Sequence, residues 1–156
     1  MKILFVCLGN ICRSPTADGV FRKVIKQAGL DGAVYVDSAG TAGWHIGKSP
    51  DGRSSEVALS RGYDLSLLRS RQVSSDDFSE FDLLLAMDSD NYSDLLSLCP
   101  NEHRHKVKKF LSYSSILPDG DVPDPYYGGE AGFERVLDLV EEACEALLRD
   151  VQGRVC

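Results

Sequence analysis

The chain has 156 residues and a net charge of −7 at neutral pH, and no apolar run approaches the roughly 20 residues of a membrane-spanning helix. This length predicts one domain, residues 1–156, and the acidic balance argues against nucleic acid and anionic membrane as partners, since both bind basic surfaces. The five cysteines are odd in number and irregularly spaced, so we expect free thiols in a reducing cytoplasm, not a secreted disulfide framework.

The first part of the chain alternates strand and helix patterns. Residues 2–6 are a short apolar run of strand formers, which predicts a buried strand with no secretory leader before it. Ser-Pro pairs predict the starts of two helices, because serine favours the N-cap and proline the first turn. In chain order, we expect a helix at residues 14–29, a strand at residues 34–37 and a helix at residues 49–62.

The second part continues the alternation. We expect a strand at residues 82–87, a helix at residues 90–98, a strand at residues 107–111 and a long amphipathic helix at residues 133–151. The acidic run at residues 76–80 predicts a solvated turn, and residues 112–129, rich in proline and glycine, predict a loop. The pattern predicts a three-layer α/β fold, in which helices cover both faces of a twisted, four-stranded parallel sheet.

A candidate phosphate-binding loop follows the first strand. Parallel sheets bind ligands beyond the carboxyl ends of their strands, which is where residues 7–13 leave the sheet. Gly9 and Asn10 are the residue types best able to adopt positive φ. A loop of this kind turns its backbone N–H groups inward around an anion, and the following helix dipole adds to the field. We expect the backbone of the intervening residues to line this nest: Leu8, Gly9, Asn10, Ile11 and Cys12.

The two ends of this loop carry the expected chemistry. The same field favours the thiolate of Cys7, which makes this residue a candidate nucleophile. Arg13 offers a planar fork that binds two phosphate oxygens, and Ser14 is placed to hydrogen-bond the Cys7 sulfur when it departs. The alternative is that Cys7 is a buried cysteine at a strand end and Arg13 is a surface charge.

A second candidate site segment lies far along the chain. A thiolate nucleophile needs an acid to protonate the leaving alcohol or phenol, and Asp124 stands between two prolines that stiffen the loop presenting it. Tyr126 and Tyr127 follow as candidate aromatic walls for a ring-bearing substrate. The alternative is a rigid surface turn with two half-buried tyrosines.

Together the two segments resemble the low-molecular-weight protein tyrosine phosphatases, and the acidic second segment looks bacterial. The resemblance rests on residues 4–15 (LFVCLGNICRSP) and 124–127 (DPYY), with further similar stretches at residues 37–41, 49–51, 71–72 and 86–88. It implies hydrolysis of protein phosphotyrosine and aryl phosphates through a phosphocysteine intermediate. The implied reaction uses no metal ion and no cofactor.

The resemblance also implies a role for each matching residue. Cys7 is the nucleophile, Arg13 binds phosphate, and Asp124 is the general acid and then the general base. Ser14 assists the leaving sulfur, and Cys12 matches the family's second loop cysteine, which forms a reversible disulfide with Cys7. The implied loop-bracing residues are Asn10 and Ser38, and the implied cleft residues are Trp44, Tyr126 and Tyr127.

One departure from the family and two alternative functions remain. Many members carry a histidine before the Arg-x-Arg-Gln stretch, where this chain has Leu67 and Leu68, so support for the phosphate loop is in doubt.

An arsenate reductase on the same fold would need further cysteines to relay a disulfide. A non-hydrolysing phosphocysteine carrier would not need Asp124. We expect a monomer or weak dimer acting on a phosphotyrosine-bearing protein.

Overall fold

Four parallel strands form one sheet in the order β2-β1-β3-β4 in the computed structural model, which describes residues 1–125 and 129–155 without the side chain of Glu130. The strands are β1 (Lys2–Cys7), β2 (Tyr35–Gly40), β3 (Leu83–Ala86) and β4 (Val107–Lys109). The helices are α1 (Arg13–Gln27), α2 (Gly52–Ser60), α3 (Asp77–Glu80), α4 (Ser89–Leu98) and α5 (Gly129–Val155). Two 3₁₀ helices complete the described elements, η1 (Asn101–Lys106) and η2 (Phe110–Tyr113).

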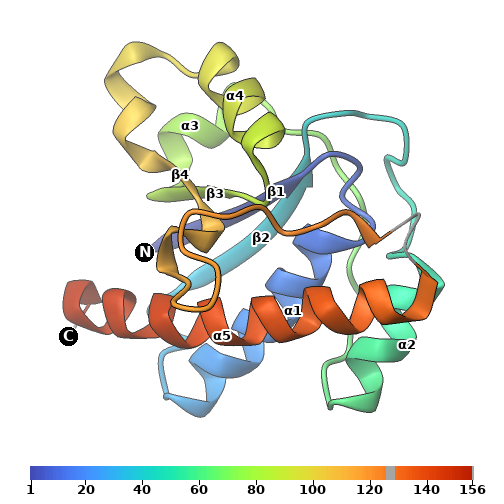
Figure 1. Ribbon diagram of the computed structural model, residues 1–156. Coiled ribbons are helices and arrows are strands. Elements are labelled where there is room, and N and C mark those ends of the chain that lie inside the picture. The colour runs from blue at the N-terminus through green and yellow to red at the C-terminus, as the bar shows by residue number, and fades with distance from the viewer. Residues whose placement is uncertain (126–128, 156) are drawn as a thin grey trace.

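Helices cover both faces of the sheet, as the sequence predicts. Figure 1 shows α1, α2 and α5 on one face and the shorter α3 and α4 on the other. Side chains along β1 alternate between the two faces of the sheet, and this alternation explains why there are two apolar cores. Ile3 and Phe5 join the larger apolar cluster beneath α1 and α5, whereas Leu4 and Val6 join the smaller one beneath α3 and α4.

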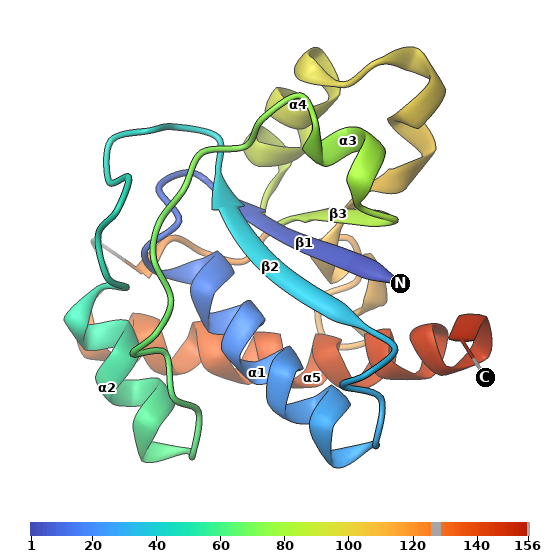
Figure 2. The ribbon, with the colours of Figure 1, turned by 180° about the vertical axis from the view of Figure 1, so that it is seen from behind.

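The order of the strands places the loop after β1 at a switch point. From β1 the chain crosses to β2 on one side and later returns to β3 on the other side of β1. Connections that diverge in this way leave a crevice at the carboxyl ends of the strands. Figure 2 shows the segment after β2 rising to this same end of the sheet. No helix of the described residues is long and apolar enough to cross a membrane.

Both predicted helix caps are wrong. Helix α1 begins at Arg13 with Cys12 at its N-cap and no side-chain cap, because the Ser14 hydroxyl contacts the Cys7 sulfur instead. Helix α2 is capped by Asp51, whose carboxylate accepts hydrogen bonds from the two N–H groups of residues 53 and 54. The Ser-Pro pairs therefore mark the right regions but not the capping residues.

Two other segments also differ from expectation. The predicted solvated turn at residues 76–80 contains α3, in which Asp77 and Phe78 are buried. Phe78 fills the smaller core, and Asp77 accepts hydrogen bonds from Arg71. The fourth strand ends at Lys109, because the chain turns into η2 at Phe110.

Candidate active site

The loop between β1 and α1 curls around the sulfur of Cys7. The Asn10 backbone N–H donates to this sulfur over 3.2 Å, and the Ser14 hydroxyl oxygen lies 3.0 Å from it. Asn10 adopts the left-handed conformation with φ of 57°, which turns its N–H inward. Cys7 is only 3% exposed, so its sulfur sits at the base of the loop beside the start of α1.

The Asn10 side chain ties the loop to two neighbouring segments. Its Nδ2 donates to Ser14 Oγ over 2.8 Å and to Ser38 Oγ over 3.0 Å. Its Oδ1 accepts the Arg71 backbone N–H over 3.0 Å. Asn10 is 2% exposed, and Ser38 is 4% exposed. The structure thus brings Asn10, Ser14 and Ser38 together, and these contacts hold the loop in its curled form.

Gly9 does not adopt the positive φ that its residue type suggested. A Cβ at this position would lie 3.0 Å from Cδ2 of His45, a tight contact, so glycine lets the loop approach His45 without displacing that side chain. On its other side, the Gly9 carbonyl accepts a hydrogen bond from Ser70 Oγ over 3.1 Å. The loop is therefore packed between His45 and the segment around residue 70.

The segment around residue 70 supports the phosphate loop, although Leu67 and Leu68 stand where the resemblance led us to expect a histidine. The Leu67 side chain is 90% exposed, so it does not pack behind the loop. Ser70 and the backbone of Arg71 supply hydrogen bonds to the loop instead of a histidine. Sequence reasoning missed Ser70, since a lone serine beside an arginine carries no distinguishing pattern.

Arg13 is a buried residue, which rules out the surface-charge interpretation. It is 3% exposed, and its Nη1 donates to Asp88 Oδ2 over 2.6 Å and to the Val122 carbonyl over 3.1 Å. Its Nη2 lies 3.8 Å from Asp124 Oδ2. Burial lowers the pKa of Arg13, but Cys7, Asp88 and Asp124 more than offset this and raise it above the usual value. The guanidinium therefore stays charged. Its hydrogen bonds to Asp88 and Val122 hold it in one orientation.

Asp88 is a site residue to which sequence reasoning gave no role. It stands just after β3, at the carboxyl end of the sheet, and its Oδ1 also accepts the Asn91 backbone N–H over 2.7 Å. One carboxylate thus caps α4 and orients Arg13. An acid directly after a buried strand was the available signal, because that position meets the ligand-binding edge of a parallel sheet.

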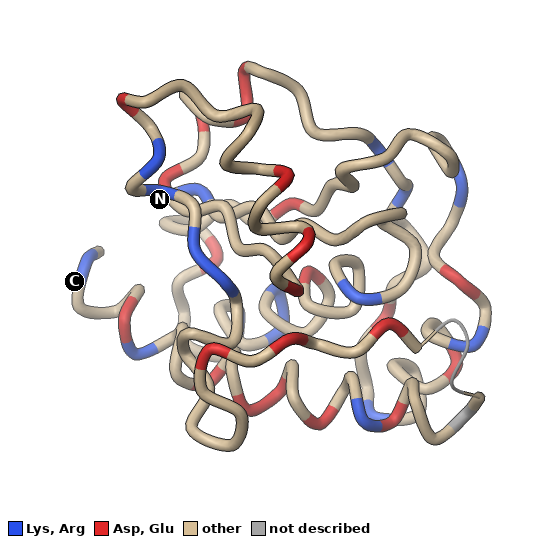
Figure 3. Tube along the Cα trace, turned by 45° about the horizontal axis from the view of Figure 1, so that its top comes forward, with Lys and Arg blue, Asp and Glu red and all other residues tan. Residues whose placement is uncertain are grey.

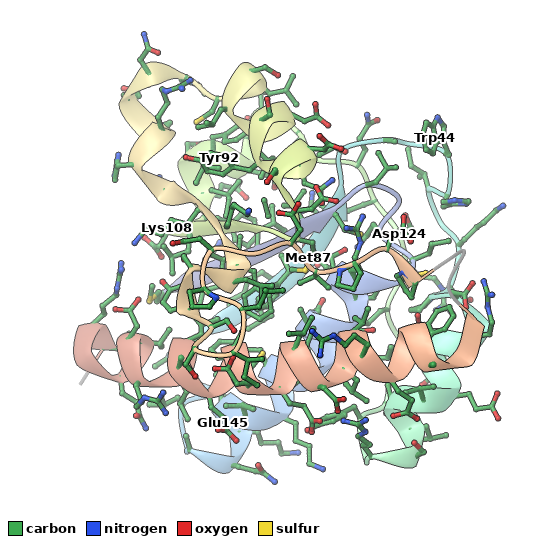
Figure 4. The ribbon with its side chains drawn as sticks, in the orientation of Figure 1. Trp44, Met87, Tyr92, Lys108, Asp124 and Glu145 are labelled. Atoms are coloured by element: carbon green, nitrogen blue, oxygen red, sulfur yellow. The ribbon has the colours of Figure 1, made fainter. Side chains whose placement is uncertain are left out.

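A cleft of about 210 Å³ opens over the loop. Its walls are formed by Cys7, Leu8, Gly9, Ile11, Cys12, Arg13, Trp44, His45 and Asp124. Figure 4 shows Trp44 and Asp124 at the same end of the molecule, although they come from segments far apart in the sequence. Trp44 is 71% exposed, and His45 is a wall residue that the sequence did not single out. The predicted cleft residues Tyr126 and Tyr127 lie outside the described residues.

Cys12 lines the cleft but is only 5% exposed. Burial raises the pKa of its thiol to about 12, and the nearby negative charges of Asp51 and Cys7 add to the effect. Cys12 therefore remains a neutral thiol at pH 7. Within residues 1–125 and 129–155, no three His, Cys, Asp or Glu side chains gather as a metal-ligand set.

The chain is similar over nearly its whole length to one family of known proteins. The model of the family described as low molecular weight phosphotyrosine protein phosphatase matches residues 2–155. A putative low molecular weight protein-tyrosine-phosphatase from Synechocystis sp. is 53% identical over 149 residues, which cover 95% of this chain and 94% of that protein. The low molecular weight protein-tyrosine-phosphatase YfkJ of Bacillus subtilis is 41% identical, covering 97% of this chain and 96% of its own.

Solved structures show the same likeness. The crystal structure of a protein tyrosine phosphatase from Entamoeba histolytica, with Hepes in the active site, superposes with a TM-score of 0.95 at 48% identity. The match covers 98% of this chain and 97% of that one. The crystal structure of YfkJ superposes with a TM-score of 0.93, covering 99% of this chain and 96% of its own.

Proposed function

This chain belongs to the low molecular weight phosphotyrosine protein phosphatase family and is a protein-tyrosine phosphatase; from that premise, we propose that Cys7, Arg13 and Asp124 perform its chemistry. The observation that carries this assignment is their convergence. The three residues come from the end of β1, the start of α1 and the loop before α5, and all three line one cleft.

In the first step, the Cys7 thiolate attacks the phosphorus of phosphotyrosine. The S–P bond forms, the bond from phosphorus to the tyrosine oxygen breaks, and Asp124 donates its proton to that oxygen. Hydrogen bonds from the Asn10 N–H and the Ser14 hydroxyl stabilise the thiolate before attack. Arg13 binds the equatorial phosphoryl oxygens, and the inward N–H groups of residues 8–12 assist it.

In the second step, water attacks the phosphorus of the phosphocysteine. Asp124, now a carboxylate, takes a proton from this water, the S–P bond breaks, and inorganic phosphate leaves. The Ser14 hydroxyl hydrogen-bonds the sulfur as it regains its negative charge. Every group that these steps require belongs to the protein or is water, so the proposed reaction uses no metal ion or cofactor.

The two alternative functions have less support. A reductase that relays a disulfide outward needs a further thiol near the cleft, yet Cys99 and Cys144 are buried at the end of α4 and within α5. Of the described cysteines, Cys12 alone accompanies Cys7 in the cleft wall. A phosphocysteine carrier has no leaving phenol to protonate, which leaves Asp124 without a purpose in the cleft.

The substrates of the enzyme are phosphotyrosine-bearing proteins. The proposal extends to one domain over residues 1–156 that acts in the cytoplasm as a monomer or weak dimer, without nucleic acid or membrane as a partner. The net charge of −7 supports the absence of these two partners, because both favour basic surfaces.

Substitution of Cys7 tests the proposal. Cys7→Ser should abolish turnover of a phosphotyrosine peptide while vanadate still binds, because the loop N–H groups and Arg13 remain. Acid-quenched wild-type enzyme should carry phosphate on Cys7. Cys99→Ser is the matched control and should retain activity, since this cysteine lies away from the cleft. Appreciable hydrolysis by purified Cys7→Ser would show that another residue is the nucleophile.

A further inference from the structure

A second cleft adjoins the phosphate site. It has a volume of about 520 Å³ and shares Leu8, Arg13 and Asp124 with the first cleft. Its other wall residues come from the start of α4 and its cap: Asp88, Asp90, Asn91, Ser93 and Asp94. A peptide whose phosphotyrosine lies over Cys7 therefore has this cleft beside it.

The walls of this second cleft carry excess negative charge. Asp88 is paired with Arg13, but Asp90 and Asp94 have no ion-pair partner among the described residues. They are four residues apart on α4, so they lie on the same side of the helix, and both are exposed. Figure 3, in which the top of Figure 1 with α4 comes forward, shows acidic positions in succession through the centre of the view.

Asn91 adds an unsatisfied acceptor to the same wall. This residue is 1% exposed, and its Oδ1 has no hydrogen-bond partner within the part of the chain that the structure describes. A buried amide oxygen without a donor is unfavourable, so an N–H group that reached this atom would be stabilised by it. The cleft therefore combines two carboxylates with an amide oxygen, and a cationic group that donates hydrogen bonds would suit it.

We infer that this second cleft binds a lysine or arginine side chain that neighbours the phosphotyrosine in the substrate protein. The inference rests on the proposed function, because it assumes that a phosphotyrosine peptide occupies the first cleft. A guanidinium or ammonium supplies both the positive charge and the N–H donors that the wall lacks. A metal ion fits less well, since the described side chains offer no set of three ligands.

Matched phosphopeptides test this selectivity. Three peptides should differ only at the positions flanking the phosphotyrosine, which carry lysine, glutamine or glutamate. For the wild-type enzyme, we expect kcat/KM to fall in that order, with the lysine peptide about 3- to 10-fold above the glutamine peptide. The preference should shrink as salt is raised, because the carboxylates are exposed.

Charge removal identifies the responsible residues. Asp90→Asn with Asp94→Asn should bring the lysine and glutamine peptides within about 2-fold of each other. The control pair, Asp31→Asn with Glu145→Gln, removes the same charge from exposed positions outside the cleft and should keep the preference. Both double variants should hydrolyse a small aryl phosphate at the wild-type rate, since this substrate has no flanking residues.

Two results would overturn the inference. One is a wild-type enzyme that hydrolyses all three peptides with equal kcat/KM, and the other is an equal loss of preference in the control pair. Failure of the proposed function looks different, because the wild-type enzyme would then hydrolyse neither the peptides nor the aryl phosphate.

Discussion

Arg13 and Asp88 form a buried ion pair in which Nη1 lies 2.6 Å from Oδ2, with the arginine side chain 4% exposed. The Val122 carbonyl accepts from the same Nη1. Both of these contacts within the protein are made by Nη1. The other terminal nitrogen, Nη2, lies toward Asp124 and the cleft. A carboxylate after β3 therefore orients the residue that is proposed to bind phosphate.

Asp88→Asn should reduce kcat/KM for a phosphotyrosine peptide by about 10- to 100-fold, because a misplaced phosphate ligand weakens alignment in the transition state. The melting temperature should also fall, because Arg13 loses its charged partner while it stays buried, although asparagine keeps the cap of α4. Asp121→Asn is the control, because this exposed carboxylate contacts Ser89 and Lys109 near the same helix. A kcat/KM within about twofold of wild type for Asp88→Asn would contradict the role of the ion pair.

Asp124→Ala should reduce kcat by about 10²- to 10⁴-fold, which is the usual contribution of a general acid. The loss should be largest for leaving groups of high pKa, because they depend most on protonation. When the two substrates are measured side by side, kcat should fall far more for unsubstituted phenyl phosphate than for nitrophenyl phosphate. An equal, small loss on both substrates would point to a different acid.

Asn10→Gly and Asn10→Ala separate backbone conformation from side-chain contacts. Glycine adopts the φ of 57° freely but makes none of the contacts to Ser14, Ser38 and Arg71. We expect kcat to fall about tenfold or more in both variants, since the loop loses its bracing. Asn10→Ala should also unfold at lower temperature, because alanine pays about 1–2 kcal/mol in this conformation. Wild-type kcat in Asn10→Gly would show that only the backbone matters.

Cys12 should decide whether peroxide damage to Cys7 is reversible. Peroxide converts the Cys7 thiolate to a sulfenic acid, and attack by the Cys12 sulfur then forms the disulfide and releases water. Burial raises the pKa of Cys12 to about 12, so this capture should be slow at pH 7 and faster at higher pH. Dithiothreitol should restore activity to the treated wild type, whereas Cys12→Ser should recover less. Equal recovery of both proteins would leave Cys12 with a packing role alone.

The sequence by itself determined the alternation of elements and the nature of the central loop. Apolar runs of strand formers indicated β1 and β3, because a strand buried on both faces has no polar positions. The loop from Cys7 to Arg13 was recognisable since its residue types suit an anion nest at the start of a helix. Asp124 was found through its flanking prolines, which act locally on the backbone. Each of these signals depends on residues that are close together in the chain.

Only the tertiary structure decided how the loop is held. Asp88, Ser70 and His45 reach it from segments that are distant in the sequence, and single polar residues in loops give no periodic signal. The same reason explains the wrong cap of α1, because Ser14 is drawn to the Cys7 sulfur by the packing of α1 against β1. It also explains α3, where burial of Phe78 in the smaller core outweighs the solvated turn that its acidic neighbours suggested. Contacts between distant segments compete with local preferences, and their outcome depends on the packing of the whole sheet.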